Sequence, residues 1–394
     1  MSLLCAGDWP QYLGAGRDGA AQDEKALSGA AESVTLWKKS LGSGYAGPVV
    51  AAGVVIVCHR MGGEMLTEAL DAKTGQSKWV HRRGTNYRDS FGFDDGPRAV
   101  PCVADGLVFT HGADGIVQAL DLADGREVWS YDTVAELQSP QGFFGRACSP
   151  LVADGKVLLN VGGRGGAGII ALEAKSGKIA WKATDHEAGY ASPILMPGDA
   201  GVAAFFTRNG ISLLEVASGK VLADEPLRAD IDASVNAATP VPCGPGRLLF
   251  SASYDVGCGV WQWDAQTRKL ENAWRAHDVL DCHYSTPVAH AGYVFGFHGR
   301  QESGAVLRCI SATDGKVQWE SSDRVPGGTL IRVGDKLLIV TEKGELWIVK
   351  ADGKKYERVR ADQILRSGHR SHAAYSAGVL YARDAEKMVA VKVE

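Results

Sequence analysis

The chain has 394 residues, of which 45% are hydrophobic and 22% charged, a composition typical of a globular protein. A net charge of −4 gives no basic signal for nucleic acid or a membrane surface, and the longest apolar run, 49–58, is too short to span a bilayer. The eight cysteines include no adjacent pair and no CxxC motif, which excludes a zinc ribbon and a thioredoxin-like site. They indicate no disulfide framework, although an oxidising compartment would leave one or two pairs open.

The first residues, MSLLCAG, resemble the end of a secretory signal or a lipoprotein box around Cys5. The alternative is an ordinary disordered N-terminus. We assign residues 1–29, which include the segment DWPQYLGAGRDG at 8–19, to an N-terminal extension. Residues 30–394 are assigned to a single repeat domain.

One segment recurs along the chain in four near copies: ALDAKTGQSKW at 69–79, ALDLADGREVW at 119–129, ALEAKSGKIAW at 171–181 and CISATDGKVQW at 309–319. In each copy an apolar strand end is followed by a turn that finishes on glycine, which takes a positive φ without steric cost. A tryptophan follows four residues after the glycine. This even offset keeps the tryptophan on one face of the next strand.

Two more strand-like runs precede each copy, so the repeating unit is four strands joined by hairpins. A repeat of about 40–50 residues with four strands is typical of a β-propeller blade, which buries its faces against its neighbours. We predict an all-β fold of eight four-stranded antiparallel blades; the alternative is seven, if one degenerate copy is an insertion. The predicted blades are 46–82, 98–133, 147–184, 190–226, 236–277, 284–323, 328–359, and 370–394 plus 34–41.

The last of these blades is predicted to combine both ends of the chain. The segment 372–394 stops after three strands, and VTLWKKSL at 34–41 is the expected fourth. A ring closed in this way has no open sheet edge at its seam, which removes a hazard of unwanted strand pairing.

The entry to the first, innermost strand of each blade aligns on a proline in most copies, as in YAGP, RAVP and YASP. Large polar and aromatic side chains recur at this level, so we expect them to surround one mouth of the central channel. The predicted mouth residues are Tyr45, Arg98, Arg146, Tyr190, Asn236, His283, Tyr284, His369, Arg370 and His372.

The hairpins between the second and third strands should open on the same face. They carry the predicted rim residues Arg60, His111, Arg164, Arg208, His298, Arg300 and Arg383. Arginine offers a planar fork for carboxylates, and aromatic rings stack on flat ligands. We therefore predict a basic, aromatic mouth that binds a small anionic or planar molecule, or an acidic peptide. The alternative is local pairing with acids in the same hairpins, which are Glu64, Asp114, Glu302 and Asp384.

The repeated segments resemble the tryptophan-docking repeat, A-x-D-x-x-T-G-x-x-x-W, of the quinoprotein-type (PQQ-like) eight-bladed propellers. The start of the chain also resembles the W-P-Q-x-x-G-x-x-R-x-G opening of secreted bacterial PQQ-like repeat proteins, and the resemblance covers roughly 8–394. The family includes the PQQ-dependent alcohol dehydrogenases and the outer-membrane assembly lipoprotein BamB, and the length here is BamB-like. The resemblance implies that the docking tryptophans pack blade against blade; they are Trp37, Trp79, Trp129, Trp181 and Trp319. Together with the first residues it implies a periplasmic or extracellular protein of the bacterial envelope.

Three other segments are weaker site candidates. VGGRGGAG at 161–168 lacks the Lys-Ser/Thr of a P-loop and is interpreted as a hairpin, and HDVLDCHYS at 277–285 has no standard metal-ligand spacing. In FGFDDGPRA at 91–99 the acids could bind a hydrated Ca²⁺, but we favour ordering of the loop by Asp94 or Asp95 through Arg98. No metal site is assigned.

The favoured function is a non-catalytic binding or scaffold propeller for a protein or peptide partner or a small anionic ligand, with no nucleic-acid partner and no catalytic residues. A monomer is expected. The first alternative is a PQQ-dependent dehydrogenase or a PQQ-binding protein, with PQQ and Ca²⁺ as cofactors. The family's dehydrogenases also carry an adjacent-cysteine disulfide, and this sequence has no such pair. The second alternative is a propeller that binds a sugar or a metabolite.

Overall fold

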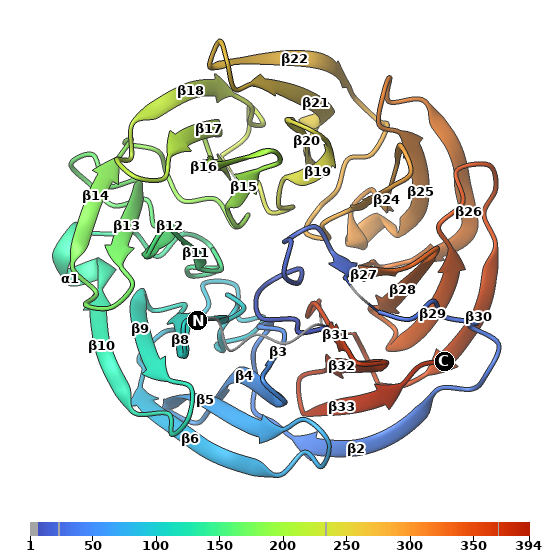
Figure 1. The fold of residues 1–394 in the computed structure, drawn as a ribbon, viewed down its shortest axis with the longest axis horizontal. Coiled ribbons are helices and arrows are strands. Elements are labelled where there is room, and N and C mark those ends of the chain that lie inside the picture. Colours follow the sequence, from blue (N-terminus) through green and yellow to red (C-terminus); the bar gives the residue numbers. More distant parts are fainter. Residues whose placement is uncertain (1–6, 23, 233–234, 369) are drawn as a thin grey trace.

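The computed structural model describes residues 7–22, 24–232, 235–368 and 370–394. Within them the chain forms eight antiparallel sheets of four strands around a central axis, and one of these sheets gains a short fifth strand (Figure 1). The prediction of an eight-bladed β-propeller is confirmed. The helical content described is small, a short α-helix α1 (Thr133–Leu137) and the 3₁₀ turn Gln301–Ser303. Cys5 lies outside the described residues.

The blades follow one another in chain order, and in each the first strand lies nearest the axis and the last lies at the perimeter (Figure 1). Blade 1 contains β3 (Val49–Ala51), β4 (Val54–Met61), β5 (Glu64–Asp71) and β6 (Ser77–Gly84). Blade 2 contains β7 (Cys102–Ala104), β8 (Leu107–His111), β9 (Ile116–Asp121) and β10 (Glu127–Asp132). Blade 3 contains β11 (Leu151–Ala153), β12 (Lys156–Asn160), β13 (Ile169–Glu173) and β14 (Ile179–Ala183). Blade 4 contains β15 (Ile194–Met196), β16 (Asp199–Phe206), β17 (Gly210–Glu215) and β18 (Val221–Pro226).

The second half of the ring repeats this order. Blade 5 contains β19 (Val241–Gly244), β20 (Arg247–Ala252), β21 (Gly257–Asp264) and β22 (Lys269–Ala276). Blade 6 contains β23 (Val288–His290), β24 (Tyr293–His298), β25 (Ala305–Ser311) and β26 (Val317–Val325). Blade 7 contains β27 (Gly328–Val333), β28 (Lys336–Thr341), β29 (Glu345–Lys350) and β30 (Arg358–Gln363). Blade 8 contains β31 (Ala374–Ser376), β32 (Val379–Arg383), β33 (Lys387–Lys392) and, from the other end of the chain, β2 (Val34–Ser40).

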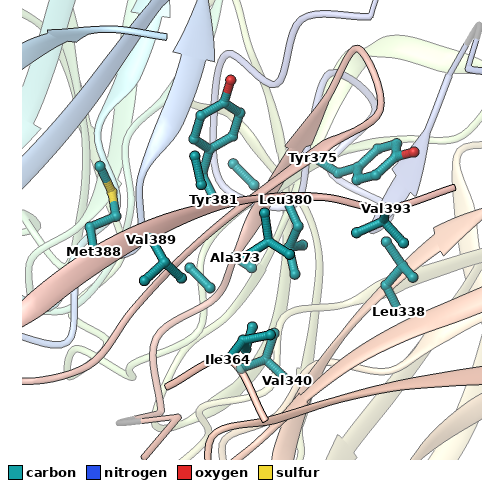
Figure 2. Close-up of a cluster of buried hydrophobic side chains, with 14 of the residues drawn as sticks. Leu338, Val340, Ile364, Ala373, Tyr375, Leu380, Tyr381, Met388, Val389 and Val393 are labelled. Atoms are coloured by element: carbon teal, nitrogen blue, oxygen red, sulfur yellow. The ribbon is translucent and has the colours of Figure 1, made fainter. Parts of the chain in front are cut away.

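Both ends of the chain share blade 8, as the sequence predicts. β2 pairs antiparallel with β33, and Trp37 lies opposite Ala390. Apolar side chains of β28 in blade 7 pack against those of β31, β32 and β33 in blade 8, including Leu338, Tyr375 and Leu380 (Figure 2). The seam of the ring is therefore closed by strand pairing and by a continuous hydrophobic core.

The repeated tryptophans contact the turn of the following blade. Trp129 Nε1 donates a hydrogen bond to the Ala174 carbonyl (2.8 Å), and a Cβ added at Gly177 would lie 2.6 Å from the indole ring. Glycine is therefore required at this turn for two reasons: the backbone φ is +69°, and a side chain would collide with the indole ring. Corresponding indole-to-carbonyl bonds are made by Trp37, Trp79, Trp181, Trp274 and Trp319.

The interface between blades 4 and 5 departs from this pattern. In blade 4 the position four residues after Gly219 is Ala223, so no indole covers the turn of blade 5. That turn has Arg268 at the glycine position, with a φ of +53°, and its guanidinium pairs with Glu215. Because no indole ring lies over this turn, a residue with a side chain fits there in place of glycine.

A chain of hydroxyl groups joins neighbouring blades close to the axis. The Val100 N–H donates to Ser149 Oγ (2.9 Å), and the Ser149 N–H donates to Ser192 Oγ (2.9 Å). The chain continues from the Ser192 N–H to Thr239 Oγ1 and from the Thr239 N–H to Thr286 Oγ1, both at 3.0 Å. Each acceptor immediately precedes a proline, so the aligned prolines mark an inner ring of inter-blade hydrogen bonds.

The N-terminal segment runs through the middle of the ring (Figure 1). Trp9 exchanges backbone hydrogen bonds with Val50 of blade 1, and β1 (Ala20–Ala21) adds to blade 7 as a parallel strand beside β27. Between them, Arg17 is 2% exposed and donates to the Ser149 and Pro150 carbonyls at 3.1 and 2.9 Å. Most of residues 9–21 are therefore buried against the inner strands of the propeller, and only Ala15 and Gly16 within this range are exposed.

Candidate functional site

A cavity of about 350 Å³ opens at one mouth of the channel. Its described lining comes from three sources: the connections that join the last strand of one blade to the first strand of the next, two hairpins between second and third strands, and the N-terminal segment. Nine of its twenty lining residues are Phe or Tyr. They are Tyr12, Tyr45, Phe91, Phe93, Phe143, Phe144, Tyr190, Tyr254 and Tyr284. We call this cavity the mouth pocket.

Seven of the ten predicted mouth residues line the mouth pocket: Tyr45, Arg98, Tyr190, His283, Tyr284, Arg370 and His372. Two others are turned away from it and hold the backbone. Arg146, 5% exposed, donates to the Ser139 and Ala113 carbonyls, and Asn236 Nδ2 donates to the Thr207 and Leu227 carbonyls. The tenth, His369, lies outside the described residues.

The buried members of the predicted rim are bound to carbonyl groups. Arg383, 1% exposed, donates to the carbonyls of blades 1 and 8, among them that of Cys58 at 3.1 Å. Arg60, 4% exposed, donates to the Tyr87 and Asp95 carbonyls. His111 Nδ1 donates to the Cys148 carbonyl at 2.9 Å, and burial lowers its pKa to about 4. These side chains support the loops and do not face the mouth pocket.

The remaining rim residues lie nearer the surface. Arg208 pairs with Glu187 (2.6 Å) and lies over the Phe143 ring, and Arg300 pairs with Glu302 (3.3 Å) and lies over the Tyr254 ring. His298 contacts Asp278, and burial lowers its pKa. Arg164 is exposed, and its backbone N–H donates to the Leu137 carbonyl. The pairing within one hairpin that we weighed as an alternative therefore describes Arg300 and Glu302. Arg208 pairs instead with an acid of the connection that precedes blade 4.

The connection 85–101 is ordered by its own acids. Asp89 pairs with Arg98 (3.5 Å), and its Oδ2 accepts from the Phe93 N–H (2.6 Å). Asp94 Oδ1 accepts from the Gly96 N–H (2.6 Å), whereas Arg98 contacts the Asp94 carbonyl oxygen. The expectation that Asp94 or Asp95 orders the loop through Arg98 needs correction, because the carboxylate on Arg98 is that of Asp89.

Two adjacent connections supply a phenylalanine cluster that the sequence analysis missed. Phe91 and Phe93 come from 85–101, and Phe143 and Phe144 come from 138–150. The Phe91 and Phe144 ring centroids are 5.2 Å apart, and those of Phe144 and Tyr190 are 5.6 Å apart. The only sequence signal was aromatic residues between glycines, in SFGFDDG and QGFFGR.

Tyr190 fixes the second of these connections. Its hydroxyl oxygen accepts hydrogen bonds from the Phe143 and Phe144 N–H groups at 2.9 and 3.0 Å. Burial raises the pKa of Tyr190, so the phenol keeps its proton near neutrality. The Phe143–Phe144 pair is therefore held against the pocket wall by backbone hydrogen bonds as well as by ring contacts.

The charged residues in the described lining have partners of opposite sign. Arg98 pairs with Asp89 and stacks between the Tyr45 and Tyr87 rings, with its guanidinium carbon 5.4 and 5.5 Å from their centroids. Arg370 pairs with Glu342 at 3.3 Å. The mouth is consequently aromatic with locally balanced charge, and the basic character that we predicted is offset by these acids.

The N-terminal segment closes the inner end of the mouth pocket. The Tyr12 hydroxyl lies 3.0 Å from His372 Nε2 and 3.2 Å from Thr286 Oγ1. Burial lowers the pKa of His372 to about 3, so this imidazole is neutral at physiological pH. The pocket thus has an uncharged floor.

The donor set of the described lining does not suit a metal-bound quinone. Glu302 is the single carboxylate among the described lining residues, and it pairs with Arg300. Across the described chain, no three His, Cys, Asp or Glu side chains are grouped as a metal site would require. The described cysteines are free thiols, and six of the seven are buried. We derive no chemistry through PQQ or Ca²⁺.

A protein-family model matches the chain. The family model described as "Outer membrane protein assembly factor BamB" matches residues 92–302, which is more than half of the chain. The match includes blades 2 to 5, the connection 138–150 and the part of the connection 85–101 that follows Phe91.

Curated relatives of two kinds are similar to the chain. BamB of Moranella endobia is 27% identical over 260 residues, which is 62% of this chain and 61% of the relative. BamB of Burkholderia pseudomallei is 27% identical over 199 residues, 49% of this chain and 45% of the relative. Quinohemoprotein alcohol dehydrogenase ADH-IIG of Pseudomonas putida is 32% identical over 158 residues, 36% of this chain and 21% of the relative. The chain thus spans less than two thirds of the length of these relatives.

Solved structures of both kinds share the fold. BamB from Moraxella catarrhalis has a TM-score of 0.67 at 16% identity, covering 92% of this chain and 98% of that one. Quinohemoprotein alcohol dehydrogenase from Comamonas testosteroni has a TM-score of 0.67 at 14% identity, covering 98% of this chain and 80% of that one. At such identities the likeness concerns the fold alone. None of the helices over the described residues has the length and hydropathy needed to cross a bilayer.

Proposed function

Because the chain belongs to the family described as outer membrane protein assembly factor BamB, we propose that it is a non-catalytic scaffold of the bacterial envelope. In this proposal the propeller binds an apolar segment of a partner polypeptide at the mouth pocket. The bacterial BamB relatives are outer membrane assembly factors by name, which supports a place on the periplasmic side of that membrane.

One observation carries the proposal. Phe91 and Phe93 are 57% and 60% exposed beside a cavity that is itself walled by aromatic rings. Exposed apolar side chains that are contiguous with a pocket mark interaction sites in soluble proteins. Full burial of a phenylalanine side chain is worth about 1.5–3 kcal/mol, so covering the exposed part of each ring is worth about 1–2 kcal/mol, and together these two residues can anchor a partner.

The chemistry of the pocket favours binding over catalysis. The Tyr254 hydroxyl is hydrogen-bonded to His283 Nε2 at 3.1 Å, and the Tyr284 hydroxyl donates to Glu342. Arg98 and Arg370 are paired with acids. These groups are committed to holding the walls, which supports an apolar partner in place of the anionic ligand or acidic peptide that we predicted.

Panning a display library of random peptides against the purified protein tests the proposal. We expect enrichment of peptides rich in aromatic and aliphatic residues, with binding at least tenfold weaker to the double variant Phe91→Ser/Phe93→Ser. The matched control is Val317→Ser, which changes a 46% exposed apolar residue on the outer strand β26. Peptides that bind the double variant as tightly as the unchanged protein would refute a partner site at this mouth.

A further inference from the structure

We infer that the mouth pocket holds one uncharged aromatic side chain of the partner, with its ring inserted between the ring walls. This inference rests on the proposed function, because it names the group of the partner that enters the pocket. Three features of the pocket lead to it: its size, the way its polar groups are used, and its charge balance.

The size suits one ring system. A volume of about 350 Å³ is at the lower end of ligand pockets, which are about 300–1,000 Å³. The Tyr12–His372 contact closes the inner end, so a chain cannot thread through the channel. The space therefore accepts a side chain and leaves the backbone of the partner outside, against Phe91 and Phe93.

Four of the five tyrosine hydroxyl groups in the described lining are hydrogen-bonded to groups of the protein. Tyr190 accepts from two backbone N–H groups, Tyr254 contacts His283, Tyr284 donates to Glu342, and Tyr12 contacts Thr286. With their polar ends held in this way, these four tyrosines offer ring faces and edges to a ligand. Aromatic pairs with centroids about 4.5–7 Å apart are favourable in offset or edge-to-face arrangements. The spacing of the existing wall, 5.2 Å for Phe91 and Phe144, lies in that range.

The charged residues of the described lining are paired with neighbouring residues, which disfavours binding of a charged aromatic group. Arg98 has Asp89, Arg370 has Glu342, and Glu302 has Arg300 as the partner of opposite sign. An anion or a cation entering the pocket would lose its hydration and meet charges that are already paired, which is costly. A neutral ring loses little on leaving water and gains contact with the walls.

The experiment follows 5-fluoroindole by ¹⁹F NMR as the protein is titrated. We expect a saturable shift and broadening, with 5-fluoroindole-2-carboxylate and 5-fluorotryptamine binding at least fivefold more weakly. Phe144→Ala should weaken 5-fluoroindole binding about two- to tenfold, the range for loss of one aromatic pair. Phe144→Leu keeps an apolar side chain at this site and should also weaken binding, and Val317→Ala on the outer strand should leave it unchanged. An anionic probe that binds more tightly than 5-fluoroindole, or a Phe144→Leu variant with undiminished binding, would overturn the inference.

A second experiment tests whether the pocket binds an aromatic side chain of a peptide or a free aromatic molecule. A capped pentapeptide, Gly-Ser-Trp-Ser-Gly, should displace 5-fluoroindole, whereas the same peptide with Leu in place of Trp should not. If the Leu peptide displaces the probe equally well, the inference of an aromatic side chain is wrong, while the apolar partner site of the proposed function stands. If neither peptide displaces a probe that does bind, the pocket takes a free aromatic molecule, and the inference is likewise overturned.

Discussion

The contact between each docking tryptophan and the next blade's turn glycine can be tested by a double-mutant cycle at Trp129 and Gly177. Trp129 is 8% exposed, and its indole N–H donates to the Ala174 carbonyl at 2.8 Å. Truncation of a buried tryptophan to alanine costs about 3–5 kcal/mol. We expect Trp129→Ala to lower the free energy of unfolding by that amount.

The second change, Gly177→Ala, should cost stability for two separable reasons. The new Cβ would lie 2.6 Å from the Trp129 ring, and the φ of +69° is strained for a residue with a side chain. Overpacking costs about 1–3 kcal/mol, and the left-handed backbone adds about 1–2 kcal/mol. In the Trp129→Ala background only the backbone cost should remain, so the double variant should be more stable than the sum of the single changes by about 1–3 kcal/mol.

Equilibrium unfolding in urea, followed by circular dichroism, measures the four free energies. The natural comparison is Arg268, at a turn that no tryptophan covers and with a φ of +53°. Its exposed pair with Glu215 contributes little, so Arg268→Ala should change stability by less than about 1 kcal/mol. Strict additivity at Trp129 and Gly177, within about 0.5 kcal/mol, would refute the steric explanation.

Three further outcomes follow from the contacts described above. Ser192→Ala removes the acceptor of the buried Ser149 N–H and should cost about 1–3 kcal/mol in urea unfolding, whereas Ser322→Ala, at an exposed position on the outer strand β26, should change stability by less than about 0.5 kcal/mol. The pKa of His111 is lowered to about 4 in the native protein, against about 6.5 when unfolded, so protonation favours unfolding as the pH falls. Its contribution is complete above about pH 6.5 and is lost by about 3 kcal/mol toward pH 4; His111→Gln should flatten that part of the stability profile, and an unchanged profile would contradict the assignment. Addition of PQQ and Ca²⁺ should leave the melting temperature and the absorbance unchanged and give no dye-linked alcohol oxidation, and activity in that assay would end the non-catalytic proposal.

The fold was predictable because its determinants are local and repeated. The turn glycine and the tryptophan four residues later, as in Gly177 and Trp181, impose one geometry at each copy, and the sequence displays it directly. Trp274 was not assigned as a docking residue because its turn has Arg268 and a shifted spacing. Its indole nevertheless donates to the Ala312 carbonyl at 3.1 Å. The strand register identifies it, since Trp274 lies opposite Val260 as Trp181 lies opposite Ala171.

For the mouth pocket, the sequence predicted only the height along the propeller axis at which the lining residues lie. Alignment on the prolines located Tyr45, Arg98 and Tyr190, because a residue at a fixed offset from a repeated strand returns to the same height in each blade. It could not show that Arg146 turns away or that Arg383 is surrounded by carbonyl groups. The orientations of these two side chains depend on which backbone carbonyl groups lie near each guanidinium. The positions of those groups are set by connections that do not repeat from blade to blade, so a repeat pattern in the sequence does not predict them.

The connections between blades differ in length, and this difference explains where the mouth pocket lies. The connection 326–327 between blades 6 and 7 has two residues, and a Cβ at Gly327 would lie 2.6 Å from the Tyr284 hydroxyl oxygen, so this side of the mouth is low and tightly packed. The connection 85–101 has seventeen residues and holds its shape through Asp89, so its phenylalanines can extend beyond the strands. Repeated inter-blade contacts stabilise the frame independently of these loops. A propeller built in this way can present apolar rings to solvent at one mouth, because the stability that they fail to contribute is supplied by repeated contacts between blades, such as the six indole-to-carbonyl hydrogen bonds of the described chain.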